Sequence, residues 1–333
     1  MLSVMQHIEN FTQILQSFKI KAECIDYKEV DNYFFYDVKL QPFAKVKDIS
    51  KFSDEISLAL KTNCKPGIKI LHSQGIVRLE FSNPRIKKLN LFEYFTSHAL
   101  PKYELPCLLG QAVDGQKVWM DLAINPHMII AGTTGSGKST LLHNIIANLL
   151  NYTKTNIFLI DPKNIEFSEY KKIKSIDISY TYEEALYTLD SLLVVMESRY
   201  ERIRDNSASI SNMPYIVLII DEFADLIMQD KNNEFYSRLC KLAQKCRAAK
   251  IRIILSTQRP SVDVINGLIK ANFPARIACK VTSHIDSKII LDAIGAENLA
   301  GKGDALIRDN SRYLERFQIA YTDAEEVCRL LAN

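Results

Sequence analysis

Residues 132–139 read GTTGSGKS and match the phosphate-binding pattern G-x-x-x-x-G-K-[ST]. The motif follows an apolar run, HMIIA at 127–131, and precedes a run with helical spacing, STLLHNIIANLL at 139–150. Glycines let backbone N–H groups approach a phosphate closely, and the N-terminus of the following helix adds a partial positive charge. A chance glycine-rich turn is the alternative, but it does not explain the flanking strand and helix. We therefore predict a P-loop that binds a nucleoside triphosphate.

Residue types within the loop indicate individual roles. The Lys138 ammonium is expected to reach the terminal phosphates as a catalytic cation, and the Ser139 hydroxyl is expected to ligate Mg²⁺. The expected cofactors are therefore ATP and Mg²⁺. The residues expected to bind the nucleotide are Gly132, Thr133, Thr134, Gly135, Ser136, Gly137, Lys138, Ser139 and Thr140.

Beyond the P-loop, short apolar runs alternate with helical stretches. The strand candidates are HMIIA, NIFLI, YIVLII, IRIILS and RIACKV, and polar residues follow nearly every one of them. This alternation predicts an α/β fold with a mostly parallel sheet and crossover helices. Ligands of such sheets bind beyond the carboxyl ends of the strands, so we expect one site assembled from several strand ends.

Asp221 and Glu222 follow the strand candidate YIVLII. An acid at this place, downstream of a P-loop, can hold Mg²⁺ directly or through water, and we predict that metal role for Asp221. Glu222 is the expected catalytic base, since a carboxylate can polarise the water that attacks the γ-phosphate. A helix N-cap is the alternative, because the helical run FADLIM follows.

Two further strand ends carry polar residues with less defined roles. Thr257 and Gln258 follow IRIILS, where a polar side chain can sense the γ-phosphate or orient the water, and Gln258 is a candidate catalytic residue. A turn that stops the strand before Pro260 is the alternative. Asp161 and Lys163 belong to the stretch DPK, which a turn explains nearly as well.

Residues 1–100 are predicted to form a small α+β domain that precedes a P-loop domain over residues 101–333. The first part holds helical runs at 4–18 and 46–61, strand runs around KIKAECIDY and NYFFYDVKL, and a closing strand pair, GIKILH and GIVRLEFS. Residues 98–117 are expected to be a connector, because they hold two prolines and a D-G turn signal.

Composition limits the class of protein. The 333 residues have a net charge of +3, so contact with nucleic acid needs a local basic patch. The seven cysteines form no C-x-x-C pair, which indicates reduced thiols in a cytoplasm. We find no run long enough for a membrane span and no basic secretory signal at the N-terminus, so a cytoplasmic protein without a direct membrane span is expected.

Two basic clusters are candidates for a DNA-binding patch. Residues 234–250 read as a helix with a predicted buried stripe of Phe235, Leu239, Leu242 and Cys246. The basic residues of this run are Arg238, Lys241, Lys245, Arg247 and Lys250, and the second cluster is Arg85, Lys87 and Lys88. A solvated helix face is the alternative for the first cluster. No base-reading module is recognisable, so contacts with double-stranded DNA are expected to go to phosphates, without sequence specificity.

Three stretches resemble the motor of the FtsK/SpoIIIE DNA translocases. They are GTTGSGKS, IIDEFADL and STQRPSVDVINGLIKANFPARIACKVTSHIDSKIILDAIGAENLAGKGDAL, and IDPK and LAQKCRAAKI fit the same pattern. The likeness spans residues 104–330, with residues 256–306 its most specific part, and residues 1–100 resemble the α subdomain that precedes this motor. The resemblance implies a RecA-like P-loop ATPase whose ATP hydrolysis is stimulated by DNA and drives translocation of double-stranded DNA.

The resemblance also implies a hexameric ring with ATP bound between subunits. A neighbour's arginine would then stabilise charge on the γ-phosphate. Arg247, just before the fourth strand, is the first candidate for this catalytic arginine and Arg276 in FPARIA is the second; a structural ion pair is the alternative for each. Lys288 stands where the family usually has arginine. The sequence shows no N-terminal membrane domain or long linker and stops at Asn333 before a winged-helix module, so a trimmed translocase is expected.

Three hypotheses of function follow. The first is a ring motor that moves chromosome or plasmid DNA. The second is a related ATPase that couples conjugative or viral DNA transfer. The third is a non-motor nucleotide switch, against which Glu222 argues, since a switch needs no fast hydrolysis.

Overall fold

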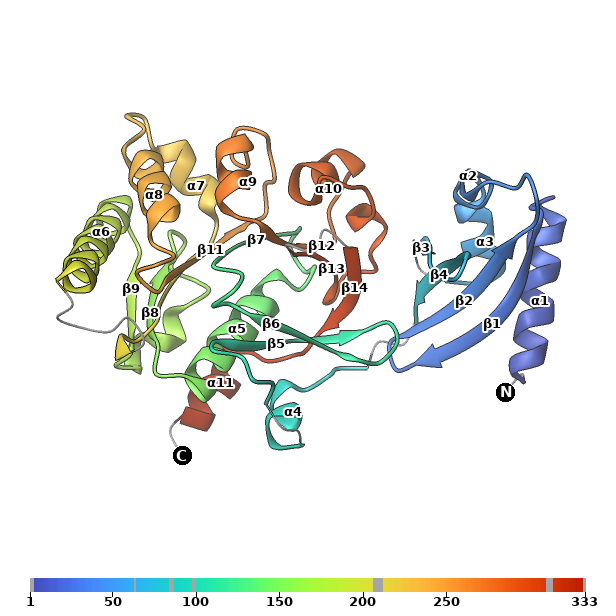
Figure 1. Ribbon diagram of the computed structural model, residues 1–333, viewed down its shortest axis with the longest axis horizontal. Helices are drawn as coiled ribbons and strands as arrows, with labels where there is room; N and C mark the ends of the chain where they lie inside the picture. Colours follow the sequence, from blue (N-terminus) through green and yellow to red (C-terminus); the bar gives the residue numbers. More distant parts are fainter. Residues whose placement is uncertain are drawn as a thin grey trace.

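The computed structural model describes residues 3–62, 64–83, 87–97, 100–205, 212–309 and 314–331. These residues build a four-stranded sheet from the N-terminal part of the chain and a ten-stranded sheet from the rest. The two sheets form the right and left parts of the molecule in Figure 1. Arg85, a member of the second basic cluster, lies outside the described residues.

The smaller sheet is antiparallel, and all four strands predicted for it are confirmed. In spatial order they are β1 (Ala22–Val30), β2 (Tyr33–Leu40), β4 (Ile76–Ser82) and β3 (Gly67–Leu71), accompanied by α1 (Val4–Ser17), α2 (Val46–Lys51) and α3 (Ser53–Ala59). Phe11 and Leu15 of α1 pack into its core. The prediction of one helix over 46–61 is wrong, because Phe52 ends α2 and stacks its ring on Phe18 at 5.5 Å between centroids.

Six neighbouring strands of the larger sheet run parallel, as the alternating pattern predicts. In spatial order they are β12 (Ala275–Cys279), β7 (His127–Ala131), β11 (Ile251–Thr257), β10 (Ile216–Ile220), β8 (Asn156–Ile160) and β9 (Ile176–Ser179). Each strand candidate of the sequence forms one of them, and β9 is an addition. Their carboxyl ends meet at one edge of the sheet, which is the edge that the P-loop occupies.

Four antiparallel strands extend this sheet beyond β12. They are β13 (Asp304–Arg308), β14 (Leu314–Ile319), β5 (Pro106–Ala112) and β6 (Lys117–Asp121). The prediction of a connector over 98–117 is therefore wrong for its second half, where β5 pairs with both β14 and β6. The D-G signal within it is a turn, with Gly115 at a φ of +91° between the strands of a hairpin.

Helices cover both faces of the larger sheet, so this part of the chain is a three-layer α/β sandwich (Figure 1). One face packs against α5 (Lys138–Tyr152) and α11 (Ala324–Leu331). The opposite face carries α6 (Tyr182–Arg204), α7 (Phe223–Gln229), α8 (Glu234–Lys245), α9 (Gly267–Asn272) and α10 (His284–Leu291). Side chains of one strand alternate between the layers: Val217 and Ile219 join the core under α5, and Leu218 joins the other core.

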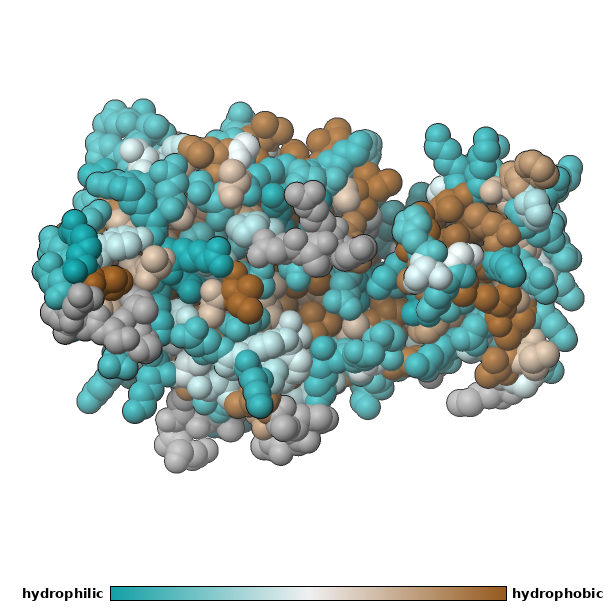
Figure 2. Space-filling model, viewed as in Figure 1, coloured by the Kyte–Doolittle hydropathy of each residue, from teal (hydrophilic) through white to brown (hydrophobic). Residues whose placement is uncertain are grey.

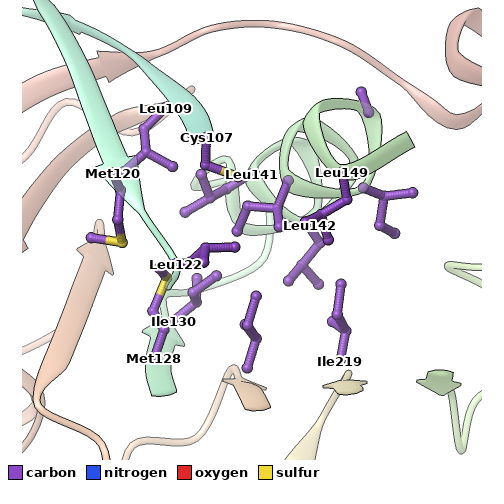
Figure 3. Packing of buried hydrophobic residues seen from close by; sticks show 14 of the residues in the cluster. Cys107, Leu109, Met120, Leu122, Met128, Ile130, Leu141, Leu142, Leu149 and Ile219 are labelled. Carbon is purple, nitrogen blue, oxygen red and sulfur yellow. The ribbon is translucent and has the colours of Figure 1, made fainter. Parts of the chain in front are cut away.

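The helix that follows the P-loop is anchored in the first of these cores. Figure 3 shows Leu141 and Leu142 of α5 on the side of Met120 of β6 and Ile130 of β7, and Leu149 above Ile219 of β10; all six side chains are buried. Because this packing fixes α5 against the sheet, it also fixes the loop between β7 and the N-terminus of α5.

The basic run at 234–250 is helical only as far as Lys245, where α8 ends and turns lead into β11. The predicted stripe is confirmed, since Phe235, Leu239, Leu242 and Cys246 are buried. Arg238 pairs with Asp190 of α6 at 2.8 Å on the surface, so one basic residue of the run is engaged by a neighbouring helix. Within the described parts of the chain, we find no helix with the length and apolar character that crossing a bilayer requires.

A buried ion pair in the larger sheet is connected to the smaller sheet by hydrogen bonds. Arg316 of β14 and Asp304 of β13 lie 2.6 Å apart with side chains 2% and 1% exposed. The Tyr33 hydroxyl of β2 donates to Asp304 at 2.9 Å, and the Ser82 hydroxyl of β4 donates to it at 3.0 Å. Burial opposes ionisation of Asp304, but the Arg316 charge holds its pKa below the ordinary value. The smaller sheet is thus fixed beside Gly303, whose backbone N–H donates to the P-loop carbonyl of Ser136 at 2.8 Å.

Candidate functional site

The P-loop runs from the end of β7 into α5. Gly135 and Gly137 adopt left-handed conformations, with φ of +74° and +110°. A Cβ on Gly137 would lie 2.6 Å from the backbone of Gly303, and one on Gly132 would lie 2.7 Å from the Cβ of Cys279. Backbone conformation and close packing therefore both require glycine here.

The Lys138 side chain is buried at the carboxyl ends of β10 and β11. Its Nζ lies 2.5 Å from Oδ1 of Asp221 and donates to Oγ of Ser256 at 2.8 Å. The Ser256 hydroxyl also donates to Asp221, at 3.1 Å. The structure thus brings together the residue expected to contact phosphate and the acid expected to hold the metal.

Glu222 is buried and hydrogen-bonded on both carboxylate oxygens. Its backbone has a φ of +46°, a region that residues other than glycine seldom adopt and that occurs at functional sites. Its Oε1 accepts hydrogen bonds from the Thr257 hydroxyl at 2.9 Å and from the backbone N–H of Gln258 at 3.2 Å. Lys163 lies 3.4 Å from Oε2. Lys163, Thr257 and Gln258, for which a turn was the alternative explanation, therefore all contact the Glu222 carboxylate.

The Gln258 side chain connects this group to the P-loop, since the Thr134 hydroxyl donates to its Oε1 at 2.8 Å. Lys163 also pairs with Asp225 of α7 at 3.4 Å. Burial lowers the pKa of Lys163, but the negative charges of Glu222 and Asp225 raise it overall. Asp161 has another role: it is fully buried and accepts from the backbone N–H of Phe167 at 3.1 Å, so it shapes the loop that follows β8.

Glu166 is a site residue that the sequence reasoning does not identify. It lies in the loop after β8, and its carboxylate accepts from the Ser139 hydroxyl at 2.8 Å and contacts Nε2 of His143 at 2.8 Å. Burial opposes its ionisation, but the hydrogen bonds from His143 and Ser139 lower its pKa overall. In the sequence, the only indication of a role for Glu166 is its place five residues after Asp161, which follows the end of a strand candidate.

Lys138, Ser139 and Glu166 line a cavity of about 690 Å³, a size that suits a nucleotide. Its walls include the P-loop, Glu166, Gln258, residues 300–303 and residues of β14. Lys88 lines it as well, with its Nζ 3.9 Å from the ring centroid of Tyr321. Lys88, expected in a basic cluster of the small domain, therefore lies at the nucleotide cavity, next to a segment from the far end of the chain.

The donor set of the cavity fits Mg²⁺. Proteins bind this ion through one or two oxygen ligands together with substrate phosphates and water. The Ser139 hydroxyl lines the cavity and the Asp221 carboxylate lies 2.5 Å from Lys138 Nζ, and these two groups would supply the protein's oxygens to the ion. Within the described residues no cluster of three or more histidine, cysteine or acidic side chains suited to a metal occurs.

The two candidate arginines lie in different surroundings. Arg247 is exposed in the turn before β11, at the edge of the sheet opposite the P-loop. Arg276 of β12 is mostly buried and ion-paired with Asp292, and its guanidinium also donates to the carbonyl of Phe273 at 3.3 Å. The geometry at Arg276 is that of a structural ion pair.

A buried P-loop lysine, an acid at the end of a neighbouring strand and a second carboxylate beside it, on a parallel sheet sandwiched by helices, define the class of RecA-like P-loop ATPases. The sequence matches the FtsK/SpoIIIE family over residues 97–213 and 206–262, and the chain belongs to this family.

Curated relatives align with nearly all of the chain. It is 33% identical to the DNA translocase FtsK of Treponema pallidum over 344 residues, covering 96% of the chain and 43% of that protein. It is 35% identical to the DNA translocase SftA of Bacillus subtilis, covering 96% of the chain and 36% of that protein. The chain thus spans less than half the length of these relatives.

Solved structures share the fold. The pCW3 conjugation coupling protein TcpA, in a monomer form with ATPγS, superposes with a TM-score of 0.68 at 22% identity, covering 97% of this chain and 99% of that one. The cytoplasmic domain of the type VII secretion ATPase EccC of Thermomonospora curvata superposes with a TM-score of 0.64 at 21% identity, covering 74% of this chain and 34% of that one.

Proposed function

We propose that this chain is an ATP-hydrolysing motor that translocates double-stranded DNA. The observation that carries the proposal is at the P-loop: Lys138, which lines a nucleotide-sized cavity, pairs with the strand-end acid Asp221, and a second strand-end carboxylate, Glu222, follows it directly. We assign hydrolysis to the site because a second carboxylate next to the acid expected to hold the metal is a group that can polarise an attacking water. The naming of relatives aligned with 96% of the chain as DNA translocases supports DNA as the substrate.

In the proposed reaction each residue of the site has one role. The P-loop backbone and Lys138 bind the phosphates, and Ser139 and Asp221 hold Mg²⁺, which neutralises phosphate charge when bound. Glu222 accepts a proton from the attacking water, and Thr257 and the backbone N–H of Gln258 orient its carboxylate by hydrogen bonds. The Gln258 side chain, bonded to Thr134, lies where it can respond to the γ-phosphate.

We further propose that the motor works as a hexameric ring that holds DNA through phosphates. A head-to-tail ring covers two different surfaces of each subunit. Figure 2 shows hydrophobic residues exposed along the upper edge of the molecule, where α9 and α10 lie, and Leu268, Ile285 and Ile294 are 45%, 58% and 58% exposed. These side chains are available to one such interface.

The test is the rate of ATP hydrolysis with and without linear duplex DNA. We expect a strong rise with duplex, and displacement of a third strand annealed to that duplex only when ATP is present. The Lys138→Ala variant is the control for contaminating hydrolysis. A rate indifferent to duplex would exclude the motor and favour a nucleotide switch. Conjugative or viral DNA transfer uses the same chemistry, so it predicts the same result in this assay.

A further inference from the structure

Glu166 connects the P-loop helix to a buried tyrosine. Ser139 and His143 lie one turn apart on α5, and both contact the Glu166 carboxylate, the first at Oε2 and the second at Oε1. Nδ1 of His143 lies 2.9 Å from the hydroxyl of Tyr170, which is fully buried. The four residues form a continuous chain of hydrogen bonds from the interior to the P-loop serine.

The direction of these hydrogen bonds follows from the chemistry of the groups. A carboxylate only accepts, so Nε2 of His143 must carry a proton and donate to Glu166. In neutral imidazole Nδ1 is then an acceptor, and the Tyr170 hydroxyl donates to it. With His143 neutral, each hydrogen bond in the series from Tyr170 through His143 to Glu166 has one donor and one acceptor. Glu166 is therefore held in place from the side away from the cavity.

These hydrogen bonds determine how the Ser139 hydroxyl is oriented. A serine hydroxyl has one proton, and this proton is donated to Glu166, so its lone pairs are directed elsewhere. The separation of Ser139 Oγ and Glu166 Oε2 is 2.8 Å, an ordinary hydrogen-bond length, so this contact holds the hydroxyl in one orientation. A cation at the P-loop therefore meets an oxygen whose orientation is already fixed.

We propose that Glu166 is a positioning residue for Mg²⁺, which orients the Ser139 hydroxyl for metal binding and is itself held by His143 and Tyr170. Partners that orient metal ligands in this way typically contribute about 10–100-fold to metal affinity. The inference rests on the proposed function only in taking the cavity to bind Mg²⁺ with a nucleotide.

The experiment measures the affinity for a fluorescent ATP analogue, once with Mg²⁺ and once with EDTA. Glu166→Ala is expected to weaken binding about tenfold or more with Mg²⁺ and to leave binding in EDTA unchanged. Binding in EDTA also reports that the variant is folded. The matched control is Glu169→Ala, an exposed glutamate three residues along the chain, which is expected to bind like the wild type under both conditions. Equal losses with Mg²⁺ and EDTA, or no loss with Mg²⁺, would overturn the proposal.

A second variant separates orientation from charge. In Glu166→Gln the amide oxygen can still accept from Ser139, and its NH₂ can donate to His143 in the other tautomer, so most Mg²⁺-dependent affinity should return. If Glu166→Gln binds as weakly as Glu166→Ala, Glu166 acts through charge and the positioning role is wrong. A wild-type protein that binds Mg²⁺–nucleotide without DNA-stimulated hydrolysis would refute the proposed motor and leave this inference standing.

Discussion

Lys138 is a buried cation of the P-loop, held by Asp221 and Ser256, and we propose that it contacts phosphate. Replacement by alanine removes that charge, so we expect Lys138→Ala to abolish ATP hydrolysis and to weaken nucleotide binding. Hydrolysis and equilibrium binding of a fluorescent ATP analogue measure the two effects. Lys154→Ala, at an exposed lysine beyond the other end of α5, is the matched control. Turnover that still rises with DNA in Lys138→Ala would contradict the P-loop assignment.

Glu222 is expected to matter for hydrolysis and not for binding. Glutamine keeps an acceptor oxygen for Thr257 and for the backbone N–H of Gln258 but loses the basic carboxylate. Glu222→Gln should therefore bind ATP normally and hydrolyse it about 10²–10⁴-fold more slowly, the usual contribution of a general base. Single-turnover hydrolysis measures the loss, with Glu183→Gln at an exposed site of α6 as control. If ATP binding disappears too, the role of Glu222 is structural.

The residues of the site differ in how far sequence could identify them. The P-loop and the pair Asp221 and Glu222 were visible because each is a local pattern at the end of an apolar run. Glu166 and His143 were not, because their contact arises only when the loop after β8 folds back over α5. The roles of Lys163 and Gln258 stayed open for the same reason, since their partner Glu222 lies on another strand.

Helices and strands differ in the same way, because some are determined by their own sequence and others by residues far along the chain. The five strand candidates beyond the P-loop each form a parallel strand, since buried runs of branched residues between helices carry a strong local signal. β5 was not predicted because it lies in a proline-containing stretch and because one of its two partners, β14, lies about two hundred residues later in the chain. The break between α2 and α3 depends on the packing of Phe52 against Phe18, which helical periodicity does not report.

The junction of the two sheets depends on the buried pair of Arg316 and Asp304. Arg316→Met would leave the Asp304 carboxylate buried without its cation, although Tyr33 and Ser82 still donate to it. Breaking a buried pair in this way costs about 3–5 kcal/mol, and we expect a loss of that size in the free energy of unfolding. Denaturant unfolding followed by fluorescence measures it.

A double variant and a pH series test this explanation. Arg316→Met combined with Asp304→Asn should be less destabilised than Arg316→Met alone, because no buried charge remains. The pKa of Asp304 is lowered in the folded protein, so its contribution is present above the pKa of the unfolded chain and is lost as pH falls through the folded value. Equal stability of the single and double variants would show that the charge of Asp304 is not the cause.

At the scale of the whole molecule, DNA binding through phosphates has a measurable signature. Each neutralised phosphate releases counterions, so affinity for duplex should fall steeply as salt rises. Phosphate contacts carry no sequence information, so duplexes of unrelated sequence should compete equally at fixed salt. A preference of about 10³-fold or more, the low end for specific DNA binders, would show that the chain reads bases.

The position of Arg247 allows a test of whether neighbouring subunits of the proposed ring share an active site. Arg247 precedes β11 whereas the P-loop follows β7, and these strands are parallel, so the two features lie at opposite edges of the sheet. The strand between them has seven residues, a span of about 20 Å, which is beyond the reach of an arginine side chain toward the nucleotide of its own subunit. In a head-to-tail ring, however, unlike surfaces of neighbouring subunits meet, and Arg247 can complete a neighbour's site.

Arg247→Ala and Lys138→Ala are therefore each expected to be inactive alone and to regain part of the ATPase activity when mixed. Some interfaces of a mixed ring then join an intact P-loop to an intact arginine. A mixture of Arg276→Ala with Lys138→Ala is the comparison, because Arg276 is engaged with Asp292 inside its own subunit and its loss should not be complemented in this way. Size-exclusion chromatography must show that the mixed subunits still assemble. Assembled rings without regained activity would exclude Arg247 as the arginine that acts between subunits.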